Sequence, residues 1–334
     1  MSPQPHVIAI VGLTATGKTK VAQRIIHELC KQVPQRFASF TILSADSRQV
    51  YAGLEITTGA DIPSQANRVT SADLPYPFFQ QALETGHDLF WHGTSILPPT
   101  QSWSVAEFRE LALATFNYAH SRNQLVFVIG GTGLYHQSLS NQNLSEMAIK
   151  PNPEVRIQAE KLSLPELQAW LKELNPTIFA QLNSSDLMNP RRLVRHIEKT
   201  LSEPAHAPTQ ANQNYLLHTF GTQLDSWEHI EANIAERVRD RIKLGALQEV
   251  GLLDYELLDP QVRTTLGLRE IHGFLDSQYD LAALEQIWTL HEKQYAKRQL
   301  TWWKKRPEVQ WFNPLDSDQV TSLTNQIIEM TEER

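Results

Sequence analysis

The sequence contains little sulfur and no long apolar segment. Cys30 is the single cysteine among 334 residues, which excludes an intrachain disulfide framework and any zinc module built from several cysteines. A reducing compartment suits such a chain, and we expect a cytoplasmic protein. No apolar run reaches the ~18 residues of a membrane-spanning helix. Residues 1–5 carry neither a basic nor an apolar leader, so we expect no signal or transit peptide and no membrane association.

Positive charge is also scarce. The 30 Lys and Arg residues stand against 37 Asp and Glu residues, which gives a formal net charge of −7. This balance argues against a protein that attracts nucleic acid through bulk charge, but it leaves room for a local basic groove. Basic residues do cluster at 191–199 and 291–306, the second time among tyrosine and tryptophan. That mixture suits a nucleic-acid strand with splayed bases, or else a solvated helix face above core aromatics.

The hydrophobic pattern predicts an α/β fold. Short β-branched apolar runs, typical of strands buried on both faces, occur at residues 7–11, 40–43 and 125–129, with a further candidate at 215–221. Helical spacing of apolar residues is found at 20–31, 105–122, 227–250 and 281–304. Strands that alternate with helices imply a parallel sheet, and its ligands bind beyond the carboxyl ends of the strands.

The chain changes character between residues 146 and 204, where strand-like runs disappear. Short helices are expected there over residues 154–161, 164–174, 176–182 and 190–201. We interpret residues 146–204 as an inserted all-helical domain, and residues 1–145 with 205–334 as the core domain. Residues 203–213 are expected to form a linker. The proline-rich stretch 62–100 indicates an irregular loop or lid.

A phosphate-binding motif follows the first expected strand. Residues 12–19, Gly-Leu-Thr-Ala-Thr-Gly-Lys-Thr, fit G-x-x-x-x-G-K-[ST] between a strand and a helix. The glycines let backbone N–H groups face a phosphate, and the helix N-terminus adds a favourable dipole. Lys18 supplies a positive charge, and Thr19 offers its hydroxyl to Mg²⁺. The motif predicts a P-loop NTPase-like parallel sheet flanked by helices, with a site for a di- or triphosphate.

Polar residues follow the second expected strand at the same edge of the sheet. Asp46 could organise Mg²⁺ and water, act as a general base, or cap the following turn. Ser47 and Gln49 suit the reading of a base edge, or are ordinary loop residues. The three alternatives for Asp46 remain open at this point.

The third expected strand ends at a glycine-rich turn. Gly130, Gly131 and Gly133 indicate a close backbone approach to a ligand or to another element, or simply a tight turn. Thr132 and Tyr135 could donate hydrogen bonds there. The fingerprint G-x-G-x-x-G of dinucleotide-binding folds is absent from this turn.

Arginines recur at helical spacing further along the chain. Arg192, Arg195 and Lys199 share one helix face. Arg237 and Arg241 are four residues apart on the helix expected at 227–250. They flank its apolar stripe, or else pair with Glu236 or Asp240.

These stretches together resemble the tRNA dimethylallyltransferase (isopentenyltransferase) family. The matching segments run almost from end to end, at residues 12–19, 44–51, 53–59, 102–108, 130–135, 152–156, 189–195, 234–237, 267–270 and 295–302. Their order and spacing are more specific than the phosphate loop alone. Several positions depart from the family pattern, namely Leu13, Thr16, Asn189, Asn233, Val238 and Leu268, as does the stretch 60–100.

The resemblance implies an activity. A member of this family transfers the dimethylallyl group from dimethylallyl diphosphate to N6 of the adenine at position 37 of tRNAs that read codons beginning with U. The products are N6-dimethylallyladenosine and diphosphate. The implied cofactor is Mg²⁺, the implied partner is the anticodon stem-loop of tRNA, and a monomer is expected. The adenine has to leave the stacked loop and enter a channel before it can react.

The resemblance also implies residue roles. Asp46, Thr19 and Arg237 would be catalytic, with Asp46 as general base and Thr19 as magnesium ligand. Diphosphate would bind at Gly12, Thr14, Ala15, Thr16, Gly17, Lys18 and Thr19. The tRNA would contact Asp46, Ser47, Arg48, Gln49, Thr132, Arg156, Arg191, Arg192, Arg195, Gly267 and Arg269, and the helical insertion would help to bind it.

Three rival functions share part of this pattern. A relative that prenylates free adenine nucleotides has the same core, but it needs neither a helical insertion nor a basic C-terminal segment. A small-molecule kinase typically has an arginine-rich lid, whereas residues 60–100 contain one basic residue, Arg68. A non-catalytic RNA-binding protein does not require the intact set of Lys18, Thr19 and Asp46.

Overall fold

The computed structural model describes residues 4–140, 152–202 and 214–332. The chain divides into two compact units, Met1–Ser140 with Gln213–Arg334, and Asn141–Asn212. We call the first the core unit and the second the helical unit. The expected domain boundaries at 145/146 and 204/205, and the linker expected at 203–213, lie outside the described residues.

The core unit is built on an eight-stranded sheet in the order β3-β4-β5-β2-β6-β1-β7-β8. Its parallel centre consists of β1 (His6–Gly12), β2 (Ser39–Ser44), β6 (Gln124–Ile129) and β7 (Leu216–Thr222), with β8 (Gln310–Phe312) added beyond β7. All four strands expected from the sequence are confirmed. The residues of these strands are mostly buried, which is why runs of apolar residues predicted them.

The expectation of a loop or lid at residues 62–100 is wrong. This stretch contains β3 (Asn67–Val69), β4 (Phe78–Ala82) and β5 (Asp88–His92). Strand β5 pairs parallel to β2, and β4 pairs antiparallel to β5, so the sheet is mixed. The apolar run of β5 is short and ends in a histidine, so the sequence pattern did not predict a strand there. His92 is nevertheless buried and stacks on Phe78, with ring centroids 4.8 Å apart.

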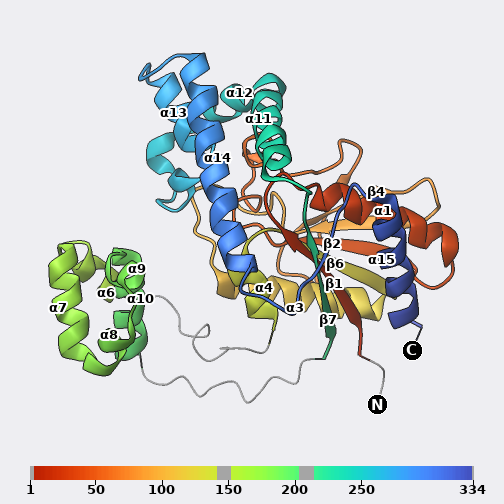
Figure 1. The fold of residues 1–334 in the computed structure, drawn as a ribbon, viewed down its shortest axis with the longest axis horizontal. Helices are drawn as coiled ribbons and strands as arrows, with labels where there is room; N and C mark the ends of the chain where they lie inside the picture. The colour runs from red at the N-terminus through yellow and green to blue at the C-terminus, as the bar shows by residue number, and fades with distance from the viewer. Residues whose placement is uncertain (1–3, 141–151, 203–213, 333–334) are drawn as a thin grey trace. The chain divides into compact units, whose positions relative to one another are not determined.

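Helices cover both faces of the sheet, and the alternation along β1 decides which core each side chain joins. Ile8 and Ile10 pack in one core beneath α1 (Lys18–Gln32) and α15 (Ser317–Met330), which contact each other. Val7, Ala9 and Val11 face the opposite core, beneath α3 (Val105–Ser121) and α4 (Gly133–Leu139). Figure 1 shows the strands between these two helical layers.

The core unit also contains elements outside the sheet and the helices that cover it. They are α2 (Glu55–Thr58), α11 (Trp227–Leu244), α12 (Ala246–Gly251), the short turns Tyr255–Leu257 and Val262–Thr264, α13 (Leu268–Leu275) and α14 (Leu281–Trp303). The helix expected at 227–250 is in fact two, because Gly245 adopts a φ of 111° and ends α11. The helix expected at 281–304 is confirmed as α14. No helix that the structure describes is long and apolar enough to cross a membrane.

The helical unit consists of α6 (Pro153–Ala159), α7 (Leu164–Leu174), α8 (Pro176–Gln181), α9 (Ser184–Leu187) and α10 (Pro190–Leu201). Four of these helices match the expected ranges to within two residues. The sequence analysis missed α9, a single turn that Asn183 caps. A small apolar core, including Leu171, Leu193 and Ile197, holds the helices together.

Candidate active site

The phosphate motif forms a tight turn between β1 and α1, the context that the motif requires. Gly12 has a φ of 134°, and a Cβ there would lie 2.5 Å from the hydroxyl of Thr222 on β7. Gly17 begins α1 with a φ of 81°. The Thr16 hydroxyl donates to the Leu13 carbonyl at 2.9 Å and lies 2.6 Å from the Thr222 hydroxyl. Strand β7 therefore fixes the turn from one side.

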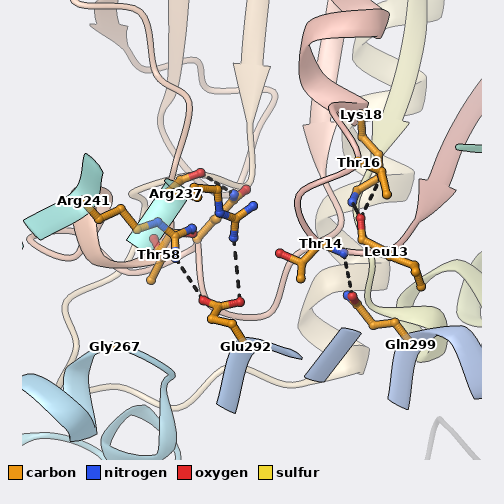
Figure 2. A network of polar contacts seen from close by, with 12 residues as sticks. Leu13, Thr14, Thr16, Lys18, Thr58, Arg237, Arg241, Gly267, Glu292 and Gln299 are labelled. Carbon is orange, nitrogen blue, oxygen red and sulfur yellow. Dashed lines mark hydrogen bonds and ion pairs between the residues drawn. The ribbon is translucent and has the colours of Figure 1, made fainter. Parts of the chain in front are cut away.

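Helix α14 fixes the same turn from another side. The Thr14 N–H donates to Oε1 of Gln299 at 2.7 Å, and both residues are buried (Figure 2). A Cβ on Gly131 would overlap the amide nitrogen of Gln299, and one on Gly133 would overlap the indole nitrogen of Trp302. Of the alternatives for the glycine-rich turn, the structure thus shows a close approach to another element. Thr132 lies there at the start of α4, beside Tyr295 of α14.

A pocket of about 230 Å³ opens next to the turn. It gathers five residues that the sequence predicted for the site, namely Thr14, Asp46, Ser47, Arg48 and Arg237. Further lining residues were not predicted, among them Thr58, Arg241, Glu292 and Tyr295. The pocket brings together the phosphate motif, the turn after β2 and helices α11 and α14, which are far apart in the sequence.

Asp46 follows β2 and lines the pocket. Its Oδ1 accepts the Arg48 N–H at 2.8 Å, which shapes the turn in the manner of an Asx turn. The Arg48 side chain donates to the Gln261 carbonyl at 2.7 Å. Gln49 donates to the Gly59 carbonyl and accepts from the Ser44 hydroxyl, each at 2.8 Å. In this structure Gln49 therefore joins the loop after α2 to the end of β2.

Glu292 organises two arginines at the pocket (Figure 2). Its Oε1 lies 3.0 Å from Nη1 of Arg241, and its Oε2 lies 3.9 Å from Nη2 of Arg237. Arg241 also donates to the Thr58 carbonyl at 3.0 Å. Burial, together with the nearby charge of Arg237, lowers the pKa of Arg241 to about 10, against the opposing effect of Glu292. The pairing with Glu236 or Asp240 considered from the sequence is wrong for Arg241.

Lys18 lies in the first turn of α1 and donates to the Leu13 carbonyl. Burial and the positive charge of Arg237 lower its pKa to about 8, while Asp46 and Asp61 oppose the shift. Thr19 follows it on α1, half-buried. An anion bound beside Lys18 would favour the protonated amine and so raise this pKa.

Gly267 and Arg269 lie at the start of α13, next to the pocket-lining residue Thr265. The Gly267 N–H donates to Oε2 of Glu270 at 2.7 Å, and Arg269 pairs with Oε1 at 2.7 Å. His291 of α14 contacts the same buried carboxylate at 2.6 Å. Gly267 has a φ of 88°, and a Cβ there would lie 2.5 Å from the Trp288 ring, so this turn requires glycine.

The helical unit holds the other predicted arginines around a buried carboxylate. Glu198, whose side chain is fully buried, lies 2.8 Å from Nε of Arg156 and 3.1 Å from Nη1 of Arg195. Arg192 pairs with Asp186. Arg191 is exposed at the first turn of α10. The sequence analysis predicted these arginines but missed Glu198, because a single glutamate within a helix gives no sign of burial.

An α/β sheet that ends in this phosphate turn, beside a carboxylate and paired arginines, defines a protein of the P-loop class. A family model for IPP transferase matches residues 49–306. The chain belongs to the IPP transferase family, as the resemblance in the sequence predicted, and it is an enzyme of that type.

Named relatives agree with this assignment. The chain is 31% identical over 313 residues to a tRNA dimethylallyltransferase of Synechococcus sp. (strain JA-3-3Ab), covering 93% of this chain and 82% of the relative. It is 29% identical to the tRNA dimethylallyltransferase of Gloeobacter violaceus, over 98% of this chain and 97% of the relative. The solved structure of a tRNA isopentenylpyrophosphate transferase from Bacillus halodurans matches with a TM-score of 0.64 at 26% identity, covering 99% and 98% of the two chains.

Proposed function

We propose that the chain transfers the dimethylallyl group from dimethylallyl diphosphate to N6 of the adenine at position 37 of tRNAs that read codons beginning with U. The observation that carries the proposal is the pocket in which Asp46, Arg237 and the phosphate turn at Thr14 meet. Such a site can hold a leaving diphosphate and a proton acceptor within one enclosure. The relatives named above are tRNA dimethylallyltransferases, which supports tRNA as the acceptor and dimethylallyl as the transferred group.

The reaction can be written with these side chains. The N6 amine attacks C1 of the allyl group, and the bond between C1 and the diphosphate oxygen breaks. The amine proton passes to the carboxylate of Asp46, the general base. Lys18, Arg237 and the backbone amides of the phosphate turn beyond Thr14, whose own N–H donates to Gln299, stabilise the negative charge that grows on the diphosphate. The products are N6-dimethylallyladenosine, diphosphate and a proton.

The site would hold Mg²⁺ through the Thr19 hydroxyl together with the donor phosphates. Among the residues that the structure describes, no cluster of three His, Cys, Asp or Glu side chains could hold a metal alone. Mg²⁺ is commonly held by one or two protein oxygens, substrate phosphates and water. The Thr19 hydroxyl would be the protein ligand, and the ion would neutralise charge on the diphosphate. We expect activity to require Mg²⁺.

The acceptor is proposed to be an anticodon stem-loop with a flipped adenine. Ser47, Arg48, Gln49, Thr132 and the Gly267–Arg269 segment would contact the flipped base and its neighbours. The helical unit, through Arg156, Arg191, Arg192 and Arg195, would contact the RNA backbone. The protein is proposed to act as a cytoplasmic monomer.

One competition assay tests the function. The protein is incubated with Mg²⁺ and radiolabelled dimethylallyl diphosphate, and is offered an anticodon stem-loop with adenines at positions 36 and 37, or AMP. We expect label in the stem-loop, and none in a control stem-loop with guanine at position 37. A stem-loop with guanine at position 36 tests the codon preference and should be a poor substrate. Label in AMP alone would overturn the choice of acceptor.

A further inference from the structure

Gln299 of α14 contacts the phosphate turn in a way that the proposed chemistry does not use. Its Oε1 accepts the Thr14 N–H at 2.7 Å, although the two residues are 285 positions apart. Gln299 is 6% exposed and Thr14 is 8% exposed. Without Gln299, the Thr14 N–H would be a buried donor that lacks this partner, which is unfavourable.

The orientation of the Gln299 amide is fixed by its surroundings. Its nitrogen lies against Gly131, where a Cβ would overlap it, and the same Cβ would lie 3.0 Å from the Gly12 carbonyl. The amide is therefore held between the phosphate turn and the glycine-rich turn after β6. Figure 2 shows its oxygen directed at the Thr14 nitrogen.

Gln299 lies on the face of α14 that points toward the pocket and the phosphate turn. Glu292 is two helical turns before it and holds Arg241, and Tyr295 lies between them and lines the pocket. Helix α14 thus contacts both the arginines, through Glu292, and the phosphate turn, through Gln299 (Figure 2).

The chemical nature of Gln299 suits this location. A carbonyl oxygen can accept the Thr14 N–H without adding negative charge beside a diphosphate site. A carboxylate in the same place would accept the same hydrogen bond but would repel the diphosphate. A turn that is held in advance also binds an anion without the loss of freedom that ordering a loose turn requires.

We infer that Gln299 is a positioning residue, which fixes the Thr14 amide and thereby prepares the phosphate turn for the donor diphosphate. The inference rests on the proposed function for the identity of the donor. Gln299 acts through the turn, and it does not touch the reacting atoms.

The test compares three substitutions in the full-length chain. Gln299→Met removes the acceptor at similar volume, Gln299→Glu keeps the acceptor and adds charge, and Gln294→Met is a control at an exposed position of the same helix. The affinity for inorganic diphosphate is measured by calorimetry in Mg²⁺. KM for dimethylallyl diphosphate and for the stem-loop is measured separately.

We expect Gln299→Met to weaken diphosphate binding about tenfold, as for the loss of one preorganised hydrogen bond. The KM for the donor should rise alongside, whereas the KM for the stem-loop should not. Gln299→Glu should bind diphosphate poorly at pH 8 and approach the wild-type protein as the pH falls and the carboxyl becomes protonated. Gln294→Met should match the wild-type protein.

Two results would overturn the inference: a diphosphate affinity unchanged in Gln299→Met, or a Gln299→Glu variant that stays impaired at low pH, where its neutral carboxyl keeps the acceptor without the charge. If the methionine variant does not fold, the recovery of the glutamate variant at low pH decides alone. Failure of the wild-type protein to label RNA would count against the proposed function instead. The diphosphate titration reads the effect of Gln299 independently of that outcome.

Discussion

Nη1 of Arg241 lies 3.0 Å from Oε1 of Glu292, and only 5% and 7% of the two side chains are exposed. The pair joins α11 to α14 at the wall of the pocket. A buried pair of this kind is not itself strongly stabilising, but removal of one partner leaves an uncompensated charge.

We therefore expect Glu292→Leu to lower the free energy of unfolding by about 3 kcal/mol. The double variant Arg241→Met/Glu292→Leu should lose less, because no fully buried charge is left without its partner; Arg237, which also faces Glu292, is 38% exposed. Urea denaturation of the full chain measures both. Asp240→Ala is the control, since the Asp240–Lys243 pair is 55% and 74% exposed and its loss should change stability by less than about 1 kcal/mol. Equal effects in Glu292→Leu and Asp240→Ala would contradict the argument.

The second prediction concerns the general base. Asp46→Asn keeps an oxygen to accept the Arg48 N–H, so the turn after β2 should retain its shape. The amide cannot accept the proton, and we expect transfer to slow by at least ~10²-fold. The affinity for diphosphate should stay near that of the wild type. A normal rate of transfer in single-turnover assays would refute the role of Asp46.

The third prediction follows from the pKa of Lys18, which is lowered to about 8. A bound diphosphate favours the protonated amine and raises this pKa. Below pH 8 the amine is already protonated in the free protein, so Lys18 contributes fully to the affinity and gives it no pH dependence there. Above pH 8 binding must take up a proton, and affinity falls until the pH passes the raised pKa of the complex.

Calorimetry of diphosphate binding between pH 7 and pH 10 checks the third prediction. Diphosphate also gains and loses protons over this range. A Lys18→Met variant measures the pH dependence of the affinity that comes from the ligand and not from Lys18. The difference between the two proteins should grow smaller as the pH rises above about 8. A constant ratio of affinities over this range would show that Lys18 does not titrate there.

The fourth prediction concerns Glu198 in the helical unit. Burial opposes ionisation of this carboxyl, but hydrogen bonds from Arg156, Arg195 and the Asn152 N–H outweigh it and lower its pKa below 4.5. Since the folded-state pKa is depressed, this stabilisation is complete above the unfolded value and is lost as the pH falls through the folded value.

Hydrogen exchange in α6 and α10 of the full chain tests this prediction. Protection of these helices should decrease below about pH 4.5 in the wild type, and it should be low already at neutral pH in Glu198→Leu. Glu160→Leu, at an exposed position of the same unit, serves as the control. Unchanged protection in Glu198→Leu would contradict the structural role.

Local signals were sufficient for part of the fold and site. Strands β1, β2, β6 and β7 and the phosphate motif could be predicted, because each is a contiguous pattern set by its own residues. The place of Asp46 at the pocket could be predicted, because this residue follows a buried strand. Strand β5 could not, since its pairing with β2, more than forty residues before it, buries residues that look like loop.

The remaining parts of the site depend on distant pairings. Arg241 looked like a partner for its helical neighbours, yet it pairs with Glu292, 51 positions later. Gln299 looked like one polar residue in a basic helix, and its contact with Thr14 exists only after α14 packs against the turn. The spacing of residues within the sequence does not indicate such long-range contacts. Sequence patterns therefore predict the residues proposed to react better than the residues that hold them in place.

The contacts that hold the phosphate turn cannot all form at once during synthesis of the chain. The ribosome makes the motif before both of its supports, because Thr222 follows Thr16 by 206 positions and Gln299 follows Thr14 by 285. An emerging chain that carries only the motif lacks both contacts. The turn therefore gains its full set of supports only after α14 has been made, and a chain that stops before α14 lacks the contact from Gln299.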